Sequence, residues 1–223
     1  HDHRLHVLHL TSGIEADWLA SNKGDLITTE TCPQHLTFDD TDVERIGTRL
    51  KMNPPIRYSH DRDTLWKRLK DGTIDCIATD HAPHTLENKN LGFPKAHSGM
   101  PGVETSLPCM LTHASEGMCS VTDVARWMCE GPANVYGMEG KGRLTEGYDA
   151  DLVLVDMETR RVIEDSDTWA RVGWTPFAGC ELTGWPIYTI VDGQVVHQRQ
   201  RDGPLRGTAV ASAGSTGRSL RFR

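Results

Sequence analysis

A short apolar run that ends in a polar pentad most constrains how this chain can fold. Residues Ile74 to Ala78 are apolar except for Asp75, and the pentad Asp80-His81-Ala82-Pro83-His84 lies just beyond them. A strand that is apolar nearly throughout is typical of a parallel sheet buried on both faces, and in such α/β folds the working residues sit at the carboxyl ends of the strands. The run therefore predicts a buried parallel strand that delivers Asp80 to one edge of an α/β fold.

Strand-like and helix-like stretches alternate over roughly the first 130 residues, which favours βα units over a sandwich. We expect strands over residues 5–10, 26–31 and 74–78, and helices over residues 14–22 and 62–70. From Thr85 to Val103 the chain is rich in Gly, Pro, Asn and Lys and shows little periodicity. We interpret it as a long loop, which in a compact domain is usually functional or disordered.

The sequence changes character after Gly137, where glycines separate short β-branched or apolar runs. Asp192-Gly193 between two such runs predicts a β-hairpin, because both central turn positions need a positive φ. Upstream, Ser120 and Asp123 form the pattern of a capping box that opens a helix. We therefore expect an α/β segment over residues 1–137, a strand-rich small-domain segment over 138–198 and a poorly ordered tail over 199–223.

Composition argues against several classes of function. The formal charge of −7 does not suit a nucleic-acid-binding surface. No run approaches the apolar length of a membrane span, and the first residues lack a signal-peptide pattern, so we expect a cytoplasmic protein without a membrane or nucleic-acid partner. Six cysteines without a Cys-x-x-Cys pair argue against a disulfide framework, and we interpret Cys32 as a small buried hydrophobe.

Two residues near predicted strand ends are candidate metal ligands. His9 lies near the end of the strand over residues 5–10 and Asp80 follows a later strand, so both could project into one cleft at the top of a barrel. Imidazole and carboxylate are donors that zinc accepts. Taken alone, a histidine beside a strand is more often structural, and spacing does not choose between His9 and His6. An aspartate at such a position needs a metal, a cation or backbone donors, or it caps a helix.

Polar residues around these positions are candidates for binding substrate. His84 is either a substrate contact or an ordinary exposed loop histidine, and His81 fits the second interpretation better. Asn53, which precedes Pro54-Pro55, would by itself more simply start a turn. The residues alone leave these alternatives open.

Several motifs together resemble the cyclic amidohydrolases, and among them the dihydroorotase family most closely. Segments 7–12 (VLHLTS), 30–36 (ETCPQHL) and 78–84 (ATDHAPH) are similar to that family's motifs on its sixth, seventh and eighth strands. Segments 51–57, 102–105, 147–153 and 174–177 also match, so the resemblance runs from about Leu5 to Val196. It implies a partial (β/α)8 TIM-type barrel, about strands 6 to 8 with their helices, followed by part of a small β-sandwich domain.

The resemblance also implies roles for individual residues. It makes His9 a zinc ligand, and Asp80 both a zinc ligand and the catalytic proton shuttle. Asn53 and His84 would bind the substrate, His84 through a substrate carboxylate, and backbone groups around Gly102 would close over it. The implied cofactor is zinc, with two ions in the complete family enzyme. The implied reaction is the reversible conversion of N-carbamoyl-L-aspartate to L-dihydroorotate in pyrimidine synthesis, in which zinc activates water and Asp80 moves a proton to the leaving nitrogen.

Other functions remain compatible with these motifs. Hydantoinases share the ETCPQ segment and allantoinases share the Asn-Pro-Pro segment, whereas the pentad favours a dihydroorotase. A non-catalytic partner is a different alternative, because the family's first-strand His-x-His pair, fourth-strand carboxylate and fifth-strand histidine have no counterparts in these 223 residues. Since a catalytic zinc takes about three protein ligands, we expect the isolated chain to be inactive. An incomplete barrel would also expose strand edges and apolar helix faces, so we expect poor solubility. A homo-oligomer or a pyrimidine-pathway enzyme partner also fits the resemblance.

Overall fold

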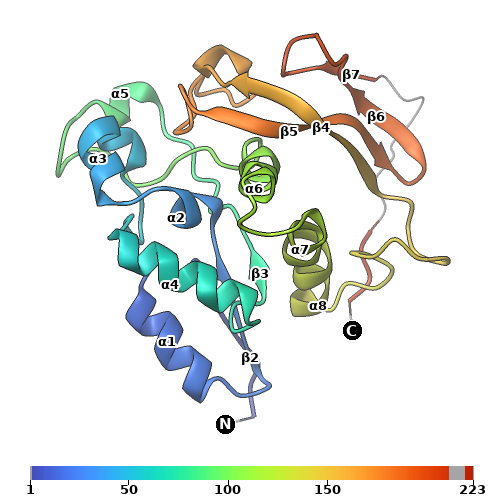
Figure 1. Ribbon diagram of the computed structural model, residues 1–223, viewed down its shortest axis with the longest axis horizontal. Coiled ribbons are helices and arrows are strands. Elements are labelled where there is room, and N and C mark those ends of the chain that lie inside the picture. Colours follow the sequence, from blue (N-terminus) through green and yellow to red (C-terminus); the bar gives the residue numbers. More distant parts are fainter. Residues whose placement is uncertain (1, 211–218, 223) are drawn as a thin grey trace. The chain divides into compact units, whose positions relative to one another are not determined.

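The computed structural model describes residues 2–210 and 219–222, which form two compact units (Figure 1). The first contains the described residues up to Ser106 together with Ala170–Pro176, and the second contains the remainder. Within the described ranges, no helix combines the length and the hydrophobicity needed to cross a bilayer. The expected domain division after Gly137 stays a prediction about the whole protein.

Strands and helices alternate in the first unit, as predicted from the sequence. The elements are β1 (Leu5–Val7), α1 (Gly13–Asn22), β2 (Ile27–Thr31), α2 (Pro33–Thr37), α3 (Asp40–Ile46), α4 (Ser59–Lys70), β3 (Cys76–Ile77) and α5 (Leu86–Lys89), with a 3-10 turn over Gly47–Leu50. The long loop expected from Thr85 to Val103 therefore contains the short helix α5.

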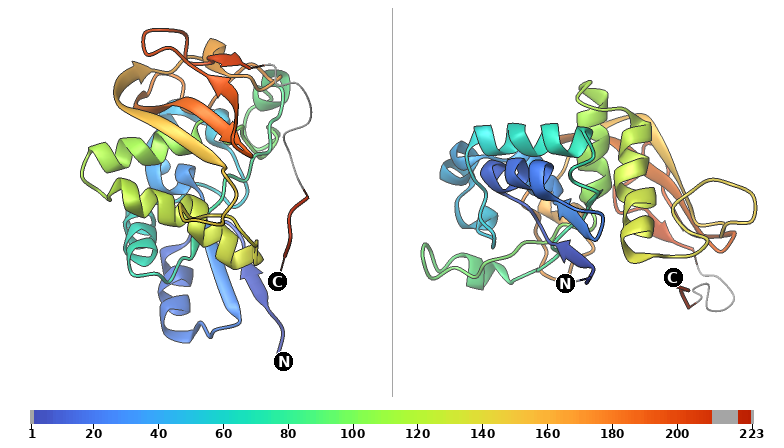
Figure 2. Two further views of the ribbon diagram at one scale, coloured as in Figure 1. Left: turned by 90° about the vertical axis from the view of Figure 1, so that its right-hand side faces the viewer. Right: turned by 90° about the horizontal axis from the view of Figure 1, so that it is seen from below.

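The three strands of the first unit form a parallel sheet in the order β1-β2-β3. Leu5 pairs with Ile27, and Glu30 pairs with Cys76. Helices α1 and α4 lie side by side along one face of this sheet (Figures 1 and 2). Helix α4 buries Leu65, Trp66 and Leu69, and Leu69 is completely inaccessible to solvent, whereas Ile14 and Trp18 of α1 are exposed.

Strand β3 is shorter than the predicted strand over residues 74–78, and at its start side-chain bonds add to the backbone bond from the Asp75 amide to the Thr29 carbonyl at 2.9 Å. The carboxylate of Asp75 accepts hydrogen bonds from the Thr29 amide at 2.7 Å and from the Lys23 ammonium at 2.6 Å. Backbone bonds continue past the other end, where the Ala78 amide donates to the Thr31 carbonyl at 2.9 Å. The segment leading to Asp80 is thus held against β2.

The second unit combines helices with an antiparallel sheet. Its elements are α6 (Ser106–Ser115), α7 (Val121–Ala125), a π-helical stretch over Arg126–Glu130, α8 (Gly131–Tyr136), β4 (Leu152–Val162), a 3-10 turn over Asp165–Asp167, β5 (Glu181–Val191), β6 (Gln194–Gln198) and β7 (Thr208–Ala209). The strand order is β4-β5-β6-β7. Helix α6 packs on β5, where the Thr183 amide donates to the hydroxyl of Thr112 at 2.8 Å.

Local signals in this unit gave correct predictions. The capping box between Ser120 and Asp123 is present at the start of α7. The hairpin between β5 and β6 turns at Asp192 and Gly193, whose φ angles are 50° and 76°. The capping box is fixed by contacts within three residues, whereas the hairpin turn also receives distant support, because the Asp192 amide donates to the Asp151 carboxylate at 2.8 Å.

Packed structure occurs in the first part of the segment expected to be a poorly ordered tail. Arg199 is only 3% exposed, and its guanidinium donates to the carbonyls of Pro186, Gln200 and Arg201. Strand β7 pairs with β6. Composition does not reveal these carbonyl partners, which is why a Gly- and Arg-rich stretch resembled a tail. Residues 211–218 and 223 lie outside the described residues.

Candidate active site

The carboxyl edge of the parallel sheet brings His9 and Asp80 to one end of the first unit. His9 follows β1 and Asp80 follows β3, so the two flank the end of the middle strand β2. The Leu10 amide donates to the Glu30 carbonyl at 2.8 Å, and the Thr31 hydroxyl donates to the Leu10 carbonyl at 2.8 Å. These bonds fix the segment after His9 on β2, opposite the segment that leads to Asp80.

His9 and Asp80 share an unusual backbone conformation. Their φ angles are 36° and 45°, in the left-handed region that side chains other than glycine rarely adopt. Among the described residues, the one further non-glycine residue with positive φ is Asp192, in the hairpin turn. Strained backbone of this kind clusters at functional sites, where surrounding contacts hold it in place. Both residues are half-buried.

His6 and His9 do not occupy the same face, so the expectation that spacing cannot separate them is wrong. They are three residues apart, whereas side chains on one face of a strand recur every two residues. Both ring nitrogens of His6 are engaged: Nδ1 lies 2.8 Å from the Thr28 hydroxyl and Nε2 lies 2.9 Å from the Glu30 carboxylate. His6 therefore belongs to the body of the sheet, and His9 to its edge.

A potential second donor cluster lies beside this His6 pair. The ligand atoms of His6, Glu30 and Cys76 all lie within 4.8 Å of one another, as the pairing of Glu30 with Cys76 across β2 and β3 requires. Burial, with the charges of Glu30 and Asp75, raises the pKa of the Cys76 thiol to about 12. Without a metal, Cys76 is therefore a neutral thiol beside the hydrogen-bonded His-Glu pair, and a cation at this cluster would have to displace the thiol proton.

Cys32 begins the turn after β2 and is completely buried. Burial raises the pKa of its thiol well above the usual value, and the nearby charges of Glu30 and Asp80 raise it further. A thiol kept protonated is a poor nucleophile. The structure thus favours the interpretation of Cys32 as a packing residue near Asp80.

His35 in α2 is a buried histidine close to His9 that the sequence did not single out. Burial lowers the pKa of its ring to about 4, and the charges of His9 and Arg57 act in the same direction. Nε2 lies 3.3 Å from the Pro54 carbonyl, so it carries the proton, and Nδ1 has no hydrogen-bond partner among the described residues. The motif over residues 30–36 contains His35 and could have indicated it, but the burial of its side chain depends on tertiary packing.

Asn53 lies on an exposed segment that is tied to the same edge of the sheet. The Thr11 hydroxyl, two residues beyond His9, donates to the Pro55 carbonyl at 2.6 Å. The Asn53–Pro54 peptide bond is cis. The side chain of Asn53 is exposed, which leaves its amide accessible for a ligand.

His84 and Gly102 lie in the loop that follows Asp80. Nε2 of His84 donates to the Ser98 carbonyl at 2.9 Å, and its ring contacts that of His97 edge-on. The Gly102 amide donates to Nδ1 of His81 at 3.1 Å, so His81 anchors the loop. A Cβ at Gly102 would lie 3.1 Å from the Thr79 carbonyl, which explains a glycine there. In this structure the Gly102 amide is already occupied by His81.

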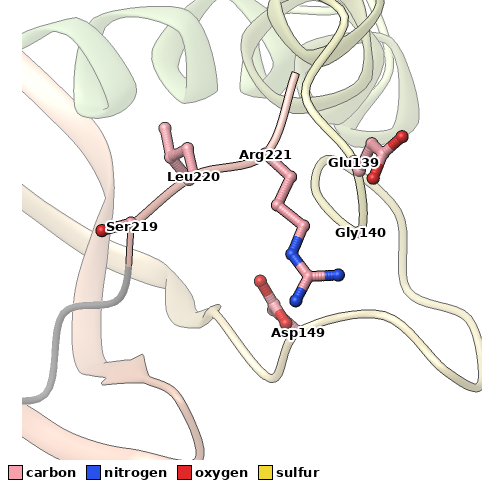
Figure 3. Close-up of a pocket in the computed structure, with 6 residues that line it drawn as sticks. All are labelled: Glu139, Gly140, Asp149, Ser219, Leu220 and Arg221. Carbon is pink, nitrogen blue, oxygen red and sulfur yellow. The ribbon is translucent and has the colours of Figure 1, made fainter. Parts of the chain in front are cut away.

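A cavity in the second unit is separate from these residues. It has a volume of about 360 Å³, and Figure 3 shows the guanidinium of Arg221 pointing toward the carboxylate of Asp149 in its wall. Glu139, Gly140, Ser219 and Leu220 complete the lining. None of the predicted site residues lines this cavity, so it is distinct from the candidate active site.

Comparison with known proteins identifies the family. The profile of the Amidohydrolase family matches residues 9–196. The chain belongs to the amidohydrolase family. Among curated amidohydrolase relatives, it is 39% identical over 199 residues to a dihydroorotase of Anoxybacillus flavithermus, covering 88% of this chain and 46% of that protein. It is 40% identical over 200 residues to a dihydroorotase of Bacillus caldolyticus, with the same coverage. The resemblance to dihydroorotases is therefore confirmed.

Solved amidohydrolase structures show the same fold. The L-hydantoinase of Arthrobacter aurescens matches with a TM-score of 0.85 and 34% identity, covering 93% of this chain and 46% of that chain. A dihydropyrimidinase of Brevibacillus agri matches with a TM-score of 0.81 and 26% identity, covering 94% of this chain and 49% of that chain. The fold is consequently of the α/β TIM-barrel type. The chain spans about half the length of the relatives it matches.

Proposed function

We propose that this chain supplies one part of the active site of a zinc-dependent dihydroorotase, which interconverts N-carbamoyl-L-aspartate and L-dihydroorotate in pyrimidine synthesis. The observation that carries the proposal is the pair of left-handed residues, His9 and Asp80, at one edge of the parallel sheet. The 39–40% identity to dihydroorotases supports it. We also predict that β1, β2 and β3 are barrel strands 6, 7 and 8. A cytoplasmic location and a homo-oligomer or pathway partner are further predictions.

The residues present fit a zinc ion. His9 offers an imidazole nitrogen and Asp80 a carboxylate oxygen, and the nearby His35 is uncharged at neutral pH because burial lowers its pKa to about 4. No positive charge on His35 therefore opposes a cation beside His9. When bound, zinc would polarise the amide carbonyl and acidify water. Two donors are fewer than the roughly three protein ligands of a catalytic zinc, so other residues of the complete protein would supply the rest.

Asp80 would transfer the proton in the reaction. During ring opening its carboxylate takes a proton from the attacking water and returns it to the ring nitrogen as the amide bond breaks. During ring closure the same group moves the proton in reverse. Its half-buried position at the sheet edge lets it contact a ligand while β3 holds its backbone.

His84 and Asn53 would bind the substrate. Because Nε2 of His84 donates to the Ser98 carbonyl at 2.9 Å, Nδ1 is the nitrogen left for a ligand. A ring protonated on both nitrogens would donate from Nδ1 to the substrate carboxylate, a charge-assisted hydrogen bond. Asn53 would contribute its exposed amide, and the Gly102 amide would have to exchange His81 for the substrate.

The direct test compares two aspartates on either side of β3 in the complete protein that contains this chain. Asp80→Asn should abolish dihydroorotate hydrolysis and leave the fold unchanged by circular dichroism. Asp75→Asn is the matched control, because Asp75 bonds to Lys23 and Thr29 and is expected to affect stability alone. Near wild-type turnover in Asp80→Asn would remove Asp80 from the mechanism. A metal-bound protein that turns over no cyclic amide would support a non-catalytic partner.

Hydantoinase activity is a second candidate, favoured by the TM-score of 0.85 to an L-hydantoinase. The substrates differ in the carboxylate that dihydroorotate carries on its ring. If the enzyme is a dihydroorotase, His84→Gln should raise the KM for dihydroorotate about tenfold or more, because a charge-assisted bond to the carboxylate is lost. Preferential opening of a 5-substituted hydantoin by the wild-type protein would instead favour the hydantoinase assignment.

A further inference from the structure

Lys89 is a lysine with no solvent exposure at the end of α5, which Figure 1 labels. Lysine is almost never fully buried unless its ammonium is paired. Here all three ammonium donors go to backbone carbonyls, those of Lys51 at 2.8 Å, His97 at 2.9 Å and Gly99 at 2.8 Å. Within the described residues, none of these bonds goes to a carboxylate. The buried charge thus serves backbone geometry, not an ion pair.

The three carbonyls belong to the segment that carries Asn53 and to the segment whose backbone accepts the hydrogen bond of His84. Lys51 lies two residues before Asn53. His97 and Gly99 flank Ser98, whose carbonyl accepts the hydrogen bond from His84. The Gly99 amide also donates to the Lys51 carbonyl at 2.9 Å, so one carbonyl receives both a backbone and a lysine donor. The ammonium therefore joins the Asn53 segment to the backbone that orients His84.

A third segment meets the same group. The Trp174 ring lies 5.7 Å from the Lys89 ammonium, and its indole nitrogen donates to the His84 carbonyl at 2.8 Å. Lys89 thus contacts the Trp174 ring, which holds the backbone of His84. It also binds the carbonyls on either side of Ser98, the residue that accepts the hydrogen bond from the His84 side chain. Burial and the charge of Lys51 lower the pKa of Lys89 to about 8, so the group stays charged at neutral pH while its donors are committed.

We propose that Lys89 is a positioning residue that sets the distance between Asn53 and His84, and thereby the fit of a substrate carrying a carboxylate. The inference rests on the proposed function of those two residues. Lys89 does not touch the substrate; it acts through the Lys51 carbonyl on one side and the carbonyls of His97 and Gly99 on the other. Because a displacement of about 1 Å in a binding group can cost about a hundredfold in kcat/KM, a small relaxation here is measurable.

The test uses Lys89→Met in the complete protein, which keeps an unbranched side chain one atom shorter and removes the ammonium donors. We expect the KM for dihydroorotate to rise about tenfold or more while kcat changes less than about threefold. Hydrogen exchange of the backbone around Gly99 should accelerate about tenfold, while that of α4 stays unchanged. Leu69→Ala is the control, because Leu69 is equally buried in the same unit and belongs to α4, outside both segments of the site. It should lower the melting temperature without changing KM.

Two results would overturn the inference. One is a Lys89→Met protein with unchanged KM and unchanged exchange around Gly99. The other is a change in both that Leu69→Ala reproduces at matched stability. If Lys89→Met does not fold, Lys89→Gln, which keeps two donors for three carbonyls, should give a smaller change in the same direction. Hydrogen exchange needs no substrate, so the two proposals can be tested separately. If the wild-type protein lacks dihydroorotase activity but Lys89→Met accelerates exchange around Gly99, the proposed function is wrong and the positioning role of Lys89 is retained.

Discussion

The indole nitrogen of Trp174 donates a hydrogen bond to the backbone carbonyl of His84 at 2.8 Å, although 90 residues separate the two in sequence. The Trp174 side chain is completely buried. Its ring also lies 5.7 Å from the guanidinium carbon of Arg49. The segment Ala170–Pro176 therefore acts as part of the first unit and fixes the loop that follows Asp80.

Trp174→Phe should lower the free energy of unfolding by about 1–3 kcal/mol, because the partly buried carbonyl of His84 loses its donor. Urea denaturation of the complete protein would measure the change. Trp169→Phe is the control: Trp169 is 56% exposed and its indole donates to the Arg206 carbonyl at 3.0 Å. Its loss should be about 0.5 kcal/mol or less, since water can replace the donor. Equal losses in the two variants would contradict a special role for Trp174.

Gly99→Ala should disturb the loop more than another glycine with positive φ. Gly99 has a φ of 126°, and a Cβ there would lie 2.6 Å from the Ala82 carbonyl. Gly117 has a φ of 79° and nothing within 4 Å of its Cβ position. An alanine there would therefore cost only the free energy of holding a non-glycine residue at positive φ, about 1–2 kcal/mol. We expect Gly117→Ala to show that loss alone, and Gly99→Ala to show a larger loss with weakened substrate binding. Thermal melting and KM, measured on both variants, decide the matter.

Asp39→Ala should remove an N-cap that also binds an arginine. The Asp39 carboxylate accepts from the Thr41 amide at 3.0 Å and from Arg62 at 2.8 Å. Its pKa is lowered chiefly by the hydrogen bond from the Thr41 hydroxyl, so the stabilisation is present above the unfolded pKa of 3.8 and is lost as pH falls below it. Urea unfolding at pH 7 should show a loss of about 1–2 kcal/mol, and at pH 3 a smaller one. Asp63→Ala, at a side chain that is 71% exposed, should have little effect at either pH.

His35 should make the protein less stable in mild acid. Its folded pKa of about 4 lies below the ordinary value of 6.5, so the unfolded chain binds more protons between these values. The free energy of unfolding should consequently fall as pH decreases from about 6.5 toward 4, by up to roughly 3 kcal/mol. His35→Phe should flatten this part of the pH profile, whereas His60→Gln, at a side chain that is 75% exposed, should leave it unchanged. A profile with the same slope in His35→Phe would assign the acid sensitivity to other groups.

Features governed by nearby residues were predictable from the sequence. The capping box at Ser120, the hairpin at Asp192 and the helices α1 and α4 follow from side chains within a turn of one another or from a regular apolar stripe. The placement of His9 and Asp80 at one sheet edge also followed, because parallel strands align their carboxyl ends.

Features that depend on distant partners were not predictable. The left-handed backbone of His9 and Asp80 leaves no mark in composition or spacing. Lys89 lies in the stretch that the sequence indicated as a loop, and its burial requires a carbonyl 38 residues earlier in the chain. Likewise, the neutral state of His35 is set by the packing around it, and Arg199 found its carbonyl partners only in the folded sheet.

The parallel pairing of β1, β2 and β3 has a consequence for how such a sequence can change over time. Main-chain hydrogen bonding spaces adjacent strands by about 4.8 Å, so the gap between the backbones at His9 and Asp80 is determined by one intervening strand. The stretch between β2 and β3, which contains α2, α3 and α4, does not enter that distance. Insertions or deletions there can accumulate without moving His9 and Asp80 apart, so the spacing of this pair is insulated from drift in loop length.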